Sequence, residues 1–349
     1  MMGLQQGRSR ALLIGALLGG LLVSSRAPAV DFDPARGEVK TLVDEVAAAG
    51  VSREWLNAAM QRADFSREVL DAMTGAAEHR LVWHSYRDIF LGEERIREGA
   101  AFIEAHRPAF ERAERVYGVP PEIIAAILGV ETRYGQIKGR HRVLDSLSTL
   151  AFHHPRRGSF FRGELKAFLE IAWEQRMAPD ELVGSYAGAM GYPQFIPTSY
   201  RAYAVDFNGD GKRNLWSDPE DAIGSIGNYF AEHRWQAGAP IYHEARGPAE
   251  PPEGVDFNQA KAPYASVGSL AQRGITAAAA LDAGTRVVPL ALELADGSSQ
   301  YRLGRDNFYV ITRYNHSYLY AMAVTELAEA IAAAREAGFV QAVQTEAAS

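Results

Sequence analysis

Apolar residues recur every three or four positions through the first third of the chain. Val39, Leu42, Val43 and Val46 show this spacing, in a segment that is poor in glycine and rich in alanine, arginine and glutamate. Such spacing places apolar side chains on one face of a helix. The pattern therefore predicts a domain of amphipathic helices over residues 30–115.

The next segment, Pro120 to Gly135, predicts a helix with an apolar face that also carries an acid. Proline suits the first turn of a helix, where the missing N–H costs nothing. Glu131 follows Ile127 by four residues, so it lies on or beside the core face. Burial raises the pKa of a carboxyl group and lets it hold a proton near neutrality, which makes Glu131 a candidate acid. Two alternatives are a side chain that reaches solvent and an ion pair with Arg133.

The pattern changes from helical to strand-like between about residue 235 and residue 307. Arg286–Leu294 and Ser299–Leu303 are predicted strands, joined by a hairpin turn at Asp296–Ser298, and Phe308–Ile311 is predicted as a further strand. Helical patterns lie on both sides of this region. The predicted fold class is α+β, mostly α, with a small β-rich insertion.

The N-terminus has the pattern of an export signal. Arg8 and Arg10 precede the apolar run Ala11 to Val23, and Ala27–Ala29 supplies small residues for cleavage. The run is short for a membrane span, so we predict a signal peptide over residues 1–29 and no stable membrane span. An uncleaved anchor is the alternative.

Composition narrows the classes of function. The net charge is −7, and removal of residues 1–29 with their three arginines would change it to −10. An acidic protein of this kind is a poor candidate for binding nucleic acid. The chain has no cysteine, which excludes disulfides, thiolate metal sites, a cysteine nucleophile and an N-terminal lipidation cysteine.

The segment Asp206–Gly211 matches the first half of a calcium-binding loop. Oxygen-bearing side chains occupy its first, third and fifth positions and glycine the sixth, and Lys212 offers a backbone carbonyl at the seventh. Position twelve is Ser217 instead of glutamate, so the loop is not a standard EF-hand, and a longer variant could close with Asp221. The alternative is a turn rich in Asp and Asn without an ion. The predicted cation site is structural, with Asp206, Asn208, Asp210, Lys212 and Asp221 as ligands.

Two further segments are candidates for ligand contact. Ser185–Pro197 contains small residues, glycines and prolines together with Tyr192 and Gln194. Glycine lets a backbone approach a ligand closely, and a structural turn is the alternative. Arg156 and Arg157 form a basic pair that suits an anionic group, or equally a solvated pair. The adjacent histidines 153 and 154 lack a third metal ligand at suitable spacing.

Four motifs together resemble the lytic murein transglycosylase B family, glycoside hydrolase family 103. They are GVETRYG around Glu131, SYAGAMGYPQFIPTSY from Ser185, DFNGDGKRNLW with DAIGSIGNYF, and RYNHSYLYAMAV near the C-terminus. The likeness runs from about Val39 to the final helix. It implies a lysozyme-like catalytic core, and the predicted divisions are residues 1–29 (signal peptide), 30–115 (helical domain), 116–235 (core with the calcium-type loop), 236–307 (β-rich insertion) and 308–349 (end of the core and final helix).

The resemblance also implies an activity and a site. The expected reaction cleaves the β-1,4 bond between N-acetylmuramic acid and N-acetylglucosamine without water and leaves a 1,6-anhydro-muramoyl end. Glu131 matches the single acid/base, no cofactor is expected for catalysis, and the calcium ion is structural. The substrate-binding residues matched by motif are Tyr86, Arg156, Arg157, Ser185, Gln194, Tyr229, Tyr314, Asn315 and Tyr320.

The chain departs from the better-known members of this family at its N-terminus, and Asn208 contributes a neutral oxygen at a loop position that varies among members. Those members begin with a lipid-anchored cysteine that this sequence lacks, which favours a soluble periplasmic protein after signal-peptide removal. The expected partners are peptidoglycan glycan strands, and proteins of cell-wall synthesis or the divisome are left open. A hydrolytic muramidase, which requires a second carboxylate, and a non-catalytic peptidoglycan-binding protein are the alternative functions.

Overall fold

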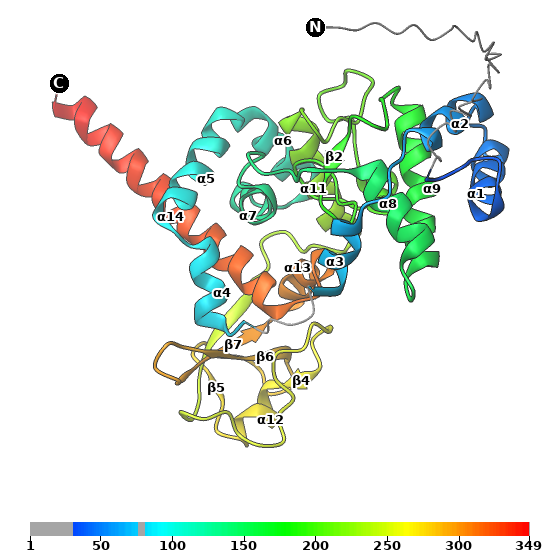
Figure 1. Cartoon of the computed structure of the whole chain (residues 1–349). Coiled ribbons are helices and arrows are strands. Elements are labelled where there is room, and N and C mark those ends of the chain that lie inside the picture. Colours follow the sequence, from blue (N-terminus) through cyan, green and yellow to red (C-terminus); the bar gives the residue numbers. More distant parts are fainter. Residues whose placement is uncertain (1–30, 76–80, 349) are drawn as a thin grey trace, which may run out of the picture. The chain divides into compact units, whose positions relative to one another are not determined.

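The computed structural model describes residues 31–75 and 81–348, and the predicted signal peptide lies outside these residues. The described residues from 31 onward form one compact unit. The helices in this part of the chain are α1 (Gly37–Ala48), α2 (Arg53–Gln61), α3 (Arg67–Gly75), α4 (Trp83–Phe90), α5 (Glu93–Ala105), α6 (Arg107–Tyr117), α7 (Pro121–Thr132), α8 (Val143–His153), α9 (Gly158–Glu174), α10 (Pro197–Tyr203), α11 (Pro219–Glu232), α12 (Val267–Ala271), α13 (Asp306–Tyr314) and α14 (Tyr318–Ala348) (Figure 1).

Short strands complete the fold and confirm the α+β class. They are β1 (His141–Arg142), β2 (Val183–Gly184), β3 (Tyr242–Arg246), β4 (Ala265–Ser266), β5 (Thr276–Ala277), β6 (Arg286–Glu293) and β7 (Ser299–Gly304). The first two pair with each other, and the others form an antiparallel sheet in the order β4-β6-β7-β3-β5. All five strands of this sheet fall inside the predicted insertion, although the domain boundaries themselves stay a prediction.

The hairpin β6–β7 forms as the sequence predicts. Leu290 pairs with Arg302 in the ladder, and the Leu294 N–H bonds to the Ser298 carbonyl across the turn. Gly297 has a φ of +79°, a conformation that tight hairpin turns require and that glycine adopts without steric strain. The apolar runs and the turn residues between them were therefore sufficient to identify both strands and their connection.

The predicted strand Phe308–Ile311 is wrong, because these residues lie in α13. Aromatic and β-branched side chains favour strands in isolation, but here Phe308 and Ile311, three positions apart, are both buried on one helical face. The buried Asn307 amide further holds the start of the helix, since it donates to the carbonyls of Gln236 and Ala239. Packing and these hydrogen bonds override the local preference.

Two large hydrophobic cores hold the helices. One contains α7 and buried side chains of α5, α6, α11, α13, α14 and the sheet, and the other joins α1–α3 to α8–α10. Tyr314 packs against both cores. No helix among the described residues combines the length and apolar character needed to cross a membrane.

Helix α7 lies at the centre of the first core. Ile124 and Ile127 have no exposed surface, and the helix packs against α5, α6, α11 and α14. A helix that is buried around its circumference must be apolar on all sides. Its rigid surroundings fix the position of whatever polar group it carries at its end.

The burial of α7 predicts a large cost for truncating Ile127. Ile127→Ala should lower the free energy of unfolding by about 2–5 kcal/mol, since it removes buried apolar surface and leaves a cavity. Ile137→Ala is the matched control, because Ile137 is 65% exposed and should change stability by less than about 0.5 kcal/mol. Chemical denaturation of both variants measures the difference. Equal losses would contradict the central position of α7.

Candidate active site

Glu131 occupies the last turn of α7, which ends in a left-handed turn. Arg133 and Tyr134 have φ values of +48° and +57°. The Tyr134 N–H bonds to the Leu128 carbonyl, and its hydroxyl donates to the Arg95 carbonyl of α5 at 2.8 Å. Gly129 makes room for this ring, since a Cβ there would lie 2.6 Å from the Tyr134 hydroxyl oxygen. The end of α7 is thus fastened to its neighbour.

The guanidinium of Arg133 is occupied by other acids. It pairs with Glu98 at 2.8 Å and with Glu94 at 2.5 Å, both in α5. These two carboxylates satisfy its charge. The predicted alternative of an ion pair between Glu131 and Arg133 therefore has no support in the geometry.

Glu131 is partly buried and accepts one strong hydrogen bond. The Tyr320 hydroxyl of α14 donates to Oε1 of Glu131 at 2.6 Å. Burial raises the pKa of Glu131 to about 7, and the hydrogen bond from Tyr320 opposes that shift. Loss of hydration disfavours the charged form more than one donor can restore. The carboxyl group therefore exchanges a proton near neutral pH.

Tyrosines surround this acid. The rings of Tyr314 and Tyr320 stack with centroids 6.3 Å apart, and Tyr314 packs edge-on against Tyr229 at 4.8 Å. The Tyr314 hydroxyl donates to the Pro193 carbonyl and the Tyr229 hydroxyl to the Arg313 carbonyl, both at 2.6 Å. Burial and the charge of Glu131 raise the pKa of Tyr314 and Tyr320 well above 10. Both phenols therefore stay protonated and act as hydrogen-bond donors.

Tyr86 of α4 belongs to the same electrostatic environment. Burial, together with the negative charge of Glu131, raises the pKa of Tyr86 to about 12. Tyr86 also lines a pocket of about 590 Å³ with Tyr318 and with Phe257, Asn258 and Gln259 of the β-rich region. The side chain of Asn258 is fixed by two hydrogen bonds to the backbone of Ala291 in β6. The sheet thus supplies one wall of the space beside Tyr86.

The segment Ser185–Pro197 folds against the end of α7. The Thr132 hydroxyl donates to the Tyr192 carbonyl and accepts from the Gly135 N–H, each at 3.0 Å. The Ser185 hydroxyl oxygen accepts from the N–H groups of Ala187 and Ala189 at 3.2 and 3.0 Å. The hydroxyl oxygen of Ser185 therefore also fixes a turn, as the structural alternative expects.

Gln194 lies beside the tyrosines. It has a φ of +50°, and its side-chain N–H₂ donates to the Gly191 carbonyl at 2.9 Å. It lines a small pocket of about 280 Å³ together with Phe195, Tyr229, Tyr314 and other residues. Its amide oxygen faces no protein donor among the described residues, so the amide can accept a hydrogen bond from a ligand.

Three predicted residues make only local contacts. Arg156 and Arg157 are exposed between α8 and α9, and their backbone N–H groups bond to the His154 ring. The Arg157 guanidinium lies over the Phe160 ring at 4.7 Å, and neither arginine pairs with a carboxylate within the described residues. Asn315 is exposed at the end of α13. The structure brings none of the three into contact with Glu131.

The predicted calcium-type loop is a series of turns closed by its own side chains. Asp206 accepts hydrogen bonds from the N–H groups of Gly209, Asp210 and Gly211. Asn208 accepts from Asp210, and Asp210 accepts from Lys212. Oδ1 of Asp206 accepts two of these bonds, whereas Oδ2 of Asp206, Oδ1 of Asn208 and Oδ1 of Asp210 accept one each and keep a lone pair. The donor set of Asp206, Asn208, Asp210 and the Lys212 carbonyl therefore fits a calcium ion in kind, since calcium prefers oxygen ligands.

Asp221 has a different role from the other predicted ligands. It is fully buried, and its two oxygens accept from the N–H groups of Phe207 and Asn214 at 2.7 Å each. It thereby ties both ends of the loop to α11. Within the described part of the chain, no three His, Asp or Glu side chains gather to hold a metal, so calcium would depend on the amide and carbonyl oxygens as well.

Sequence reasoning missed the residues that support this site. Thr132, Glu98 and the segment Phe257–Gln259 have ordinary local patterns and gave no signal. The Pro193 carbonyl, which accepts from the Tyr314 hydroxyl, was also missed. It is a backbone group, so the identity of the side chain gives no signal of its role. Only the tertiary structure identifies such contacts.

The family described as "Transglycosylase SLT domain" matches residues 34–329. The chain is 48% identical over 253 residues to membrane-bound lytic murein transglycosylase B of Escherichia coli K12. The matched region covers 72% of this chain and 68% of that protein.

Solved structures show the same similarity. The soluble lytic transglycosylase SltB1 from Pseudomonas aeruginosa superimposes with a TM-score of 0.80 at 44% identity, over 86% of this chain and 100% of that one. An Escherichia coli lytic transglycosylase solved in complex with calcium gives a TM-score of 0.78 at 43% identity, over 85% and 93% of the two chains.

The raised pKa of Glu131 predicts a pH dependence of stability. The folded protein holds this proton up to a pKa of about 7, whereas the unfolded chain releases it near 4.5. Stability contributed by the protonated acid is therefore full at low pH and is lost as the pH rises through this window, by about 3 kcal/mol in total.

Glu131→Gln should abolish that dependence. Relative to the parent protein, the variant should gain stability between pH 4 and pH 8, as measured by denaturation at several pH values. Glu181→Gln, at an exposed glutamate, is the matched control and should follow the parent. A constant difference between Glu131→Gln and the parent would contradict the buried acid.

Proposed function

The chain belongs to the transglycosylase SLT-domain family, and on that premise we propose that it is a lytic murein transglycosylase of the cell envelope. It cleaves the β-1,4 bond between N-acetylmuramic acid and N-acetylglucosamine in peptidoglycan without water, and leaves a 1,6-anhydro-muramoyl end. The observation that carries this proposal is Glu131, a partly buried acid with a pKa of about 7 in a family fold that is known for this reaction class.

Glu131 acts first as the general acid. Since Tyr320 donates to Oε1, that oxygen is an acceptor, and the exchangeable proton resides on Oε2. This proton passes to the glycosidic oxygen as the bond to C1 breaks. A pKa near the working pH lets the same group release and recover a proton in each cycle.

Glu131 then acts as the general base. Its carboxylate takes the proton of the muramic acid 6-hydroxyl while that oxygen attacks C1 and closes the anhydro ring. The nucleophile belongs to the substrate, so the rate gain comes from holding it in place. The protonated phenols of Tyr314 and Tyr320 limit the access of water and keep the acid in one orientation.

The hydrolytic alternative needs a second carboxylate about 5–10 Å from the first. Burial raises the pKa of Glu131 and the hydrogen bond from Tyr320 opposes the rise, and no carboxylate of the described residues is among the groups that shift it. This supports a single acid/base. A purely binding protein would have no use for a desolvated carboxyl group, which favours the enzyme over that alternative.

The sugar-binding residues in this proposal are those that the family resemblance implies, and two pockets support part of the set. Gln194, Tyr229 and Tyr314 line one pocket, and Tyr86 lines another. Ser185 and Asn315 extend this set toward the 2-acetamido group, whereas Arg156 and Arg157 would contact a more distant anionic part of the glycan or its stem peptide. The glycan strand is the partner.

The loop at Asp206–Lys212 binds a structural calcium ion in this proposal. An Escherichia coli relative is described in complex with calcium, and the donors at Asp206, Asn208, Asp210 and the Lys212 carbonyl suit that ion. Asp221 holds the loop to α11 and completes the site. Calcium would stabilise the fold and take no part in the chemistry.

The protein acts in the periplasm in this proposal. The basic and apolar pattern of residues 1–29 supports export through a cleaved signal peptide. The murein activity named for the Escherichia coli relative requires access to the cell wall, which agrees with this location.

Glu131→Gln should fold normally and lose at least about 100-fold in activity on purified sacculi, because it can neither give nor accept the proton. Mass spectrometry of released muropeptides measures both the rate and the products. Glu181→Gln should keep the activity of the parent. Reducing-end products instead of anhydro ends from the parent would establish a hydrolase.

Asp210→Ala tests whether the loop binds a calcium ion. The substitution should lower the melting temperature when calcium is present, because a ligand that binds only the folded state stabilises it. The effect should shrink in a chelator, where parent and variant both lack the ion. Equal shifts with and without chelator would show that Asp210 acts only through its turn.

A further inference from the structure

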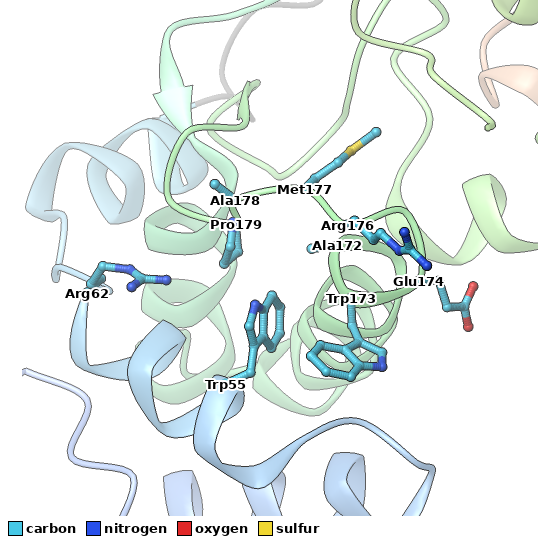
Figure 2. Close-up of a pocket in the computed structure, with 9 residues that line it drawn as sticks. All are labelled: Trp55, Arg62, Ala172, Trp173, Glu174, Arg176, Met177, Ala178 and Pro179. Atoms are coloured by element: carbon cyan, nitrogen blue, oxygen red, sulfur yellow. The ribbon is translucent and has the colours of Figure 1, made fainter. Parts of the chain in front are cut away.

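A pocket of about 670 Å³ lies outside the site described above, between α2 and the end of α9 (Figure 2). Trp55 contributes from α2, and Trp173 from α9. Its other walls include Arg62, Arg176 and Met177. None of these residues contacts Glu131 or the tyrosines around it, so the pocket is a separate feature of the molecule.

Two indole rings form the floor of this pocket. Trp55 and Trp173 pack edge to face with centroids 5.6 Å apart (Figure 2), and Trp173 is 38% exposed. Neither indole N–H donates a hydrogen bond within the described residues. The pair thus offers an accessible aromatic face together with two free donors, which is the combination that suits an amphipathic ligand.

Some charged side chains of the pocket are ion-paired, and one arginine is not. Arg62 pairs with Asp180 at 3.2 Å, and Glu174 pairs with Arg213 at 3.3 Å. Arg176 has no carboxylate partner in the described part of the chain. The pocket therefore carries one available guanidinium at its exposed edge, beside Trp173.

The backbone at Arg176 is unusual. Its φ is +56°, and the following N–H, of Met177, bonds to the Ala172 carbonyl at 2.8 Å. This is the arrangement that ends many helices, and glycine usually occupies the left-handed position. Arg133 has the same left-handed conformation at the end of α7. At Arg176 this turn ends α9 and sets the side chain in the lining of the pocket.

From these features we propose that the Trp55–Trp173 pocket is a second, non-catalytic binding site for a saccharide that bears a carboxylate. The apolar face of a sugar ring would stack on Trp173, and its hydroxyls would accept from the indole N–H groups. A carboxylate of the stem peptide that the sugar bears would pair with Arg176, because the carboxyl group of muramic acid itself is amide-linked to that peptide. The volume suits one or two sugar residues. Resting on the proposed function, the occupant is a stretch of peptidoglycan strand away from the bond being cleaved.

Such a site would hold the enzyme on an insoluble polymer between cleavage events. Two weak sites on one chain raise the apparent affinity for a polymer, because the second contact is intramolecular once the first has formed. The pocket would therefore affect retention on sacculi more than the chemistry at Glu131.

The test uses the full mature chain with Glu131→Gln as the background, so that the polymer is bound and not cut. Co-sedimentation measures binding to purified sacculi, and chitin beads serve as a neutral polymer of N-acetylglucosamine. Trp173→Ala should weaken binding to sacculi by about three- to tenfold, and Trp173→Phe, which keeps a ring, should recover most of the loss.

Arg176→Ala examines the carboxylate. It should weaken binding to sacculi by about three- to tenfold and leave binding to chitin unchanged. Arg115→Ala removes one exposed positive charge from α6 and is the matched control, with unchanged binding to both polymers. Melting temperatures within about 2 °C of the background show that the variants fold.

Unchanged binding of both Trp173→Ala and Arg176→Ala to sacculi would overturn the proposal. A protein occupant of the pocket would give that same result. Equal losses on sacculi and chitin for Arg176→Ala would overturn the carboxylate. Because these assays measure binding, their outcome is separate from the reaction products that test the proposed function.

Discussion

The structure depends on one carboxyl group that is held away from bulk water at the end of a buried helix. Burial raises the pKa of Glu131 to about 7, and Tyr320 limits the shift by donating to Oε1. The acid is therefore neither a permanent anion nor a permanent neutral group. Every other feature of the site keeps this balance by fixing the position of the helix end or excluding solvent.

Two kinds of support keep Glu131 in place. Arg133, two positions after it, is neutralised by Glu94 and Glu98 of α5, so the charge of Arg133 does not lower the pKa of the acid. Thr132, the next residue, holds the segment that carries Gln194 by a hydrogen bond to the Tyr192 carbonyl. Three consecutive residues at the end of α7 thus serve the proposed chemistry, the attachment of the segment that carries Gln194 and the packing of the helix end.

The sequence predicted the elements whose patterns are local. The α7 helix, the β6–β7 hairpin and the position of Glu131 beside the buried face of α7 all follow from spacing and turn residues. Phe308–Ile311 was assigned wrongly because burial on one helical face overrides the strand preference of its side chains. The burial of Asp221 depends on the backbone N–H groups of Phe207 and Asn214, which lie 14 and 7 positions away in the sequence. No local pattern encodes such contacts.

Tyr314 packs against both hydrophobic cores, and its hydroxyl is bound to the Pro193 carbonyl. A repacking substitution in α8 or α9 therefore reaches the same ring as one in α11 or α14. These two parts of the chain, which are far apart in sequence, are therefore expected to change together during evolution. A substitution that one core tolerates must leave the shared tyrosine in the position that the other core needs.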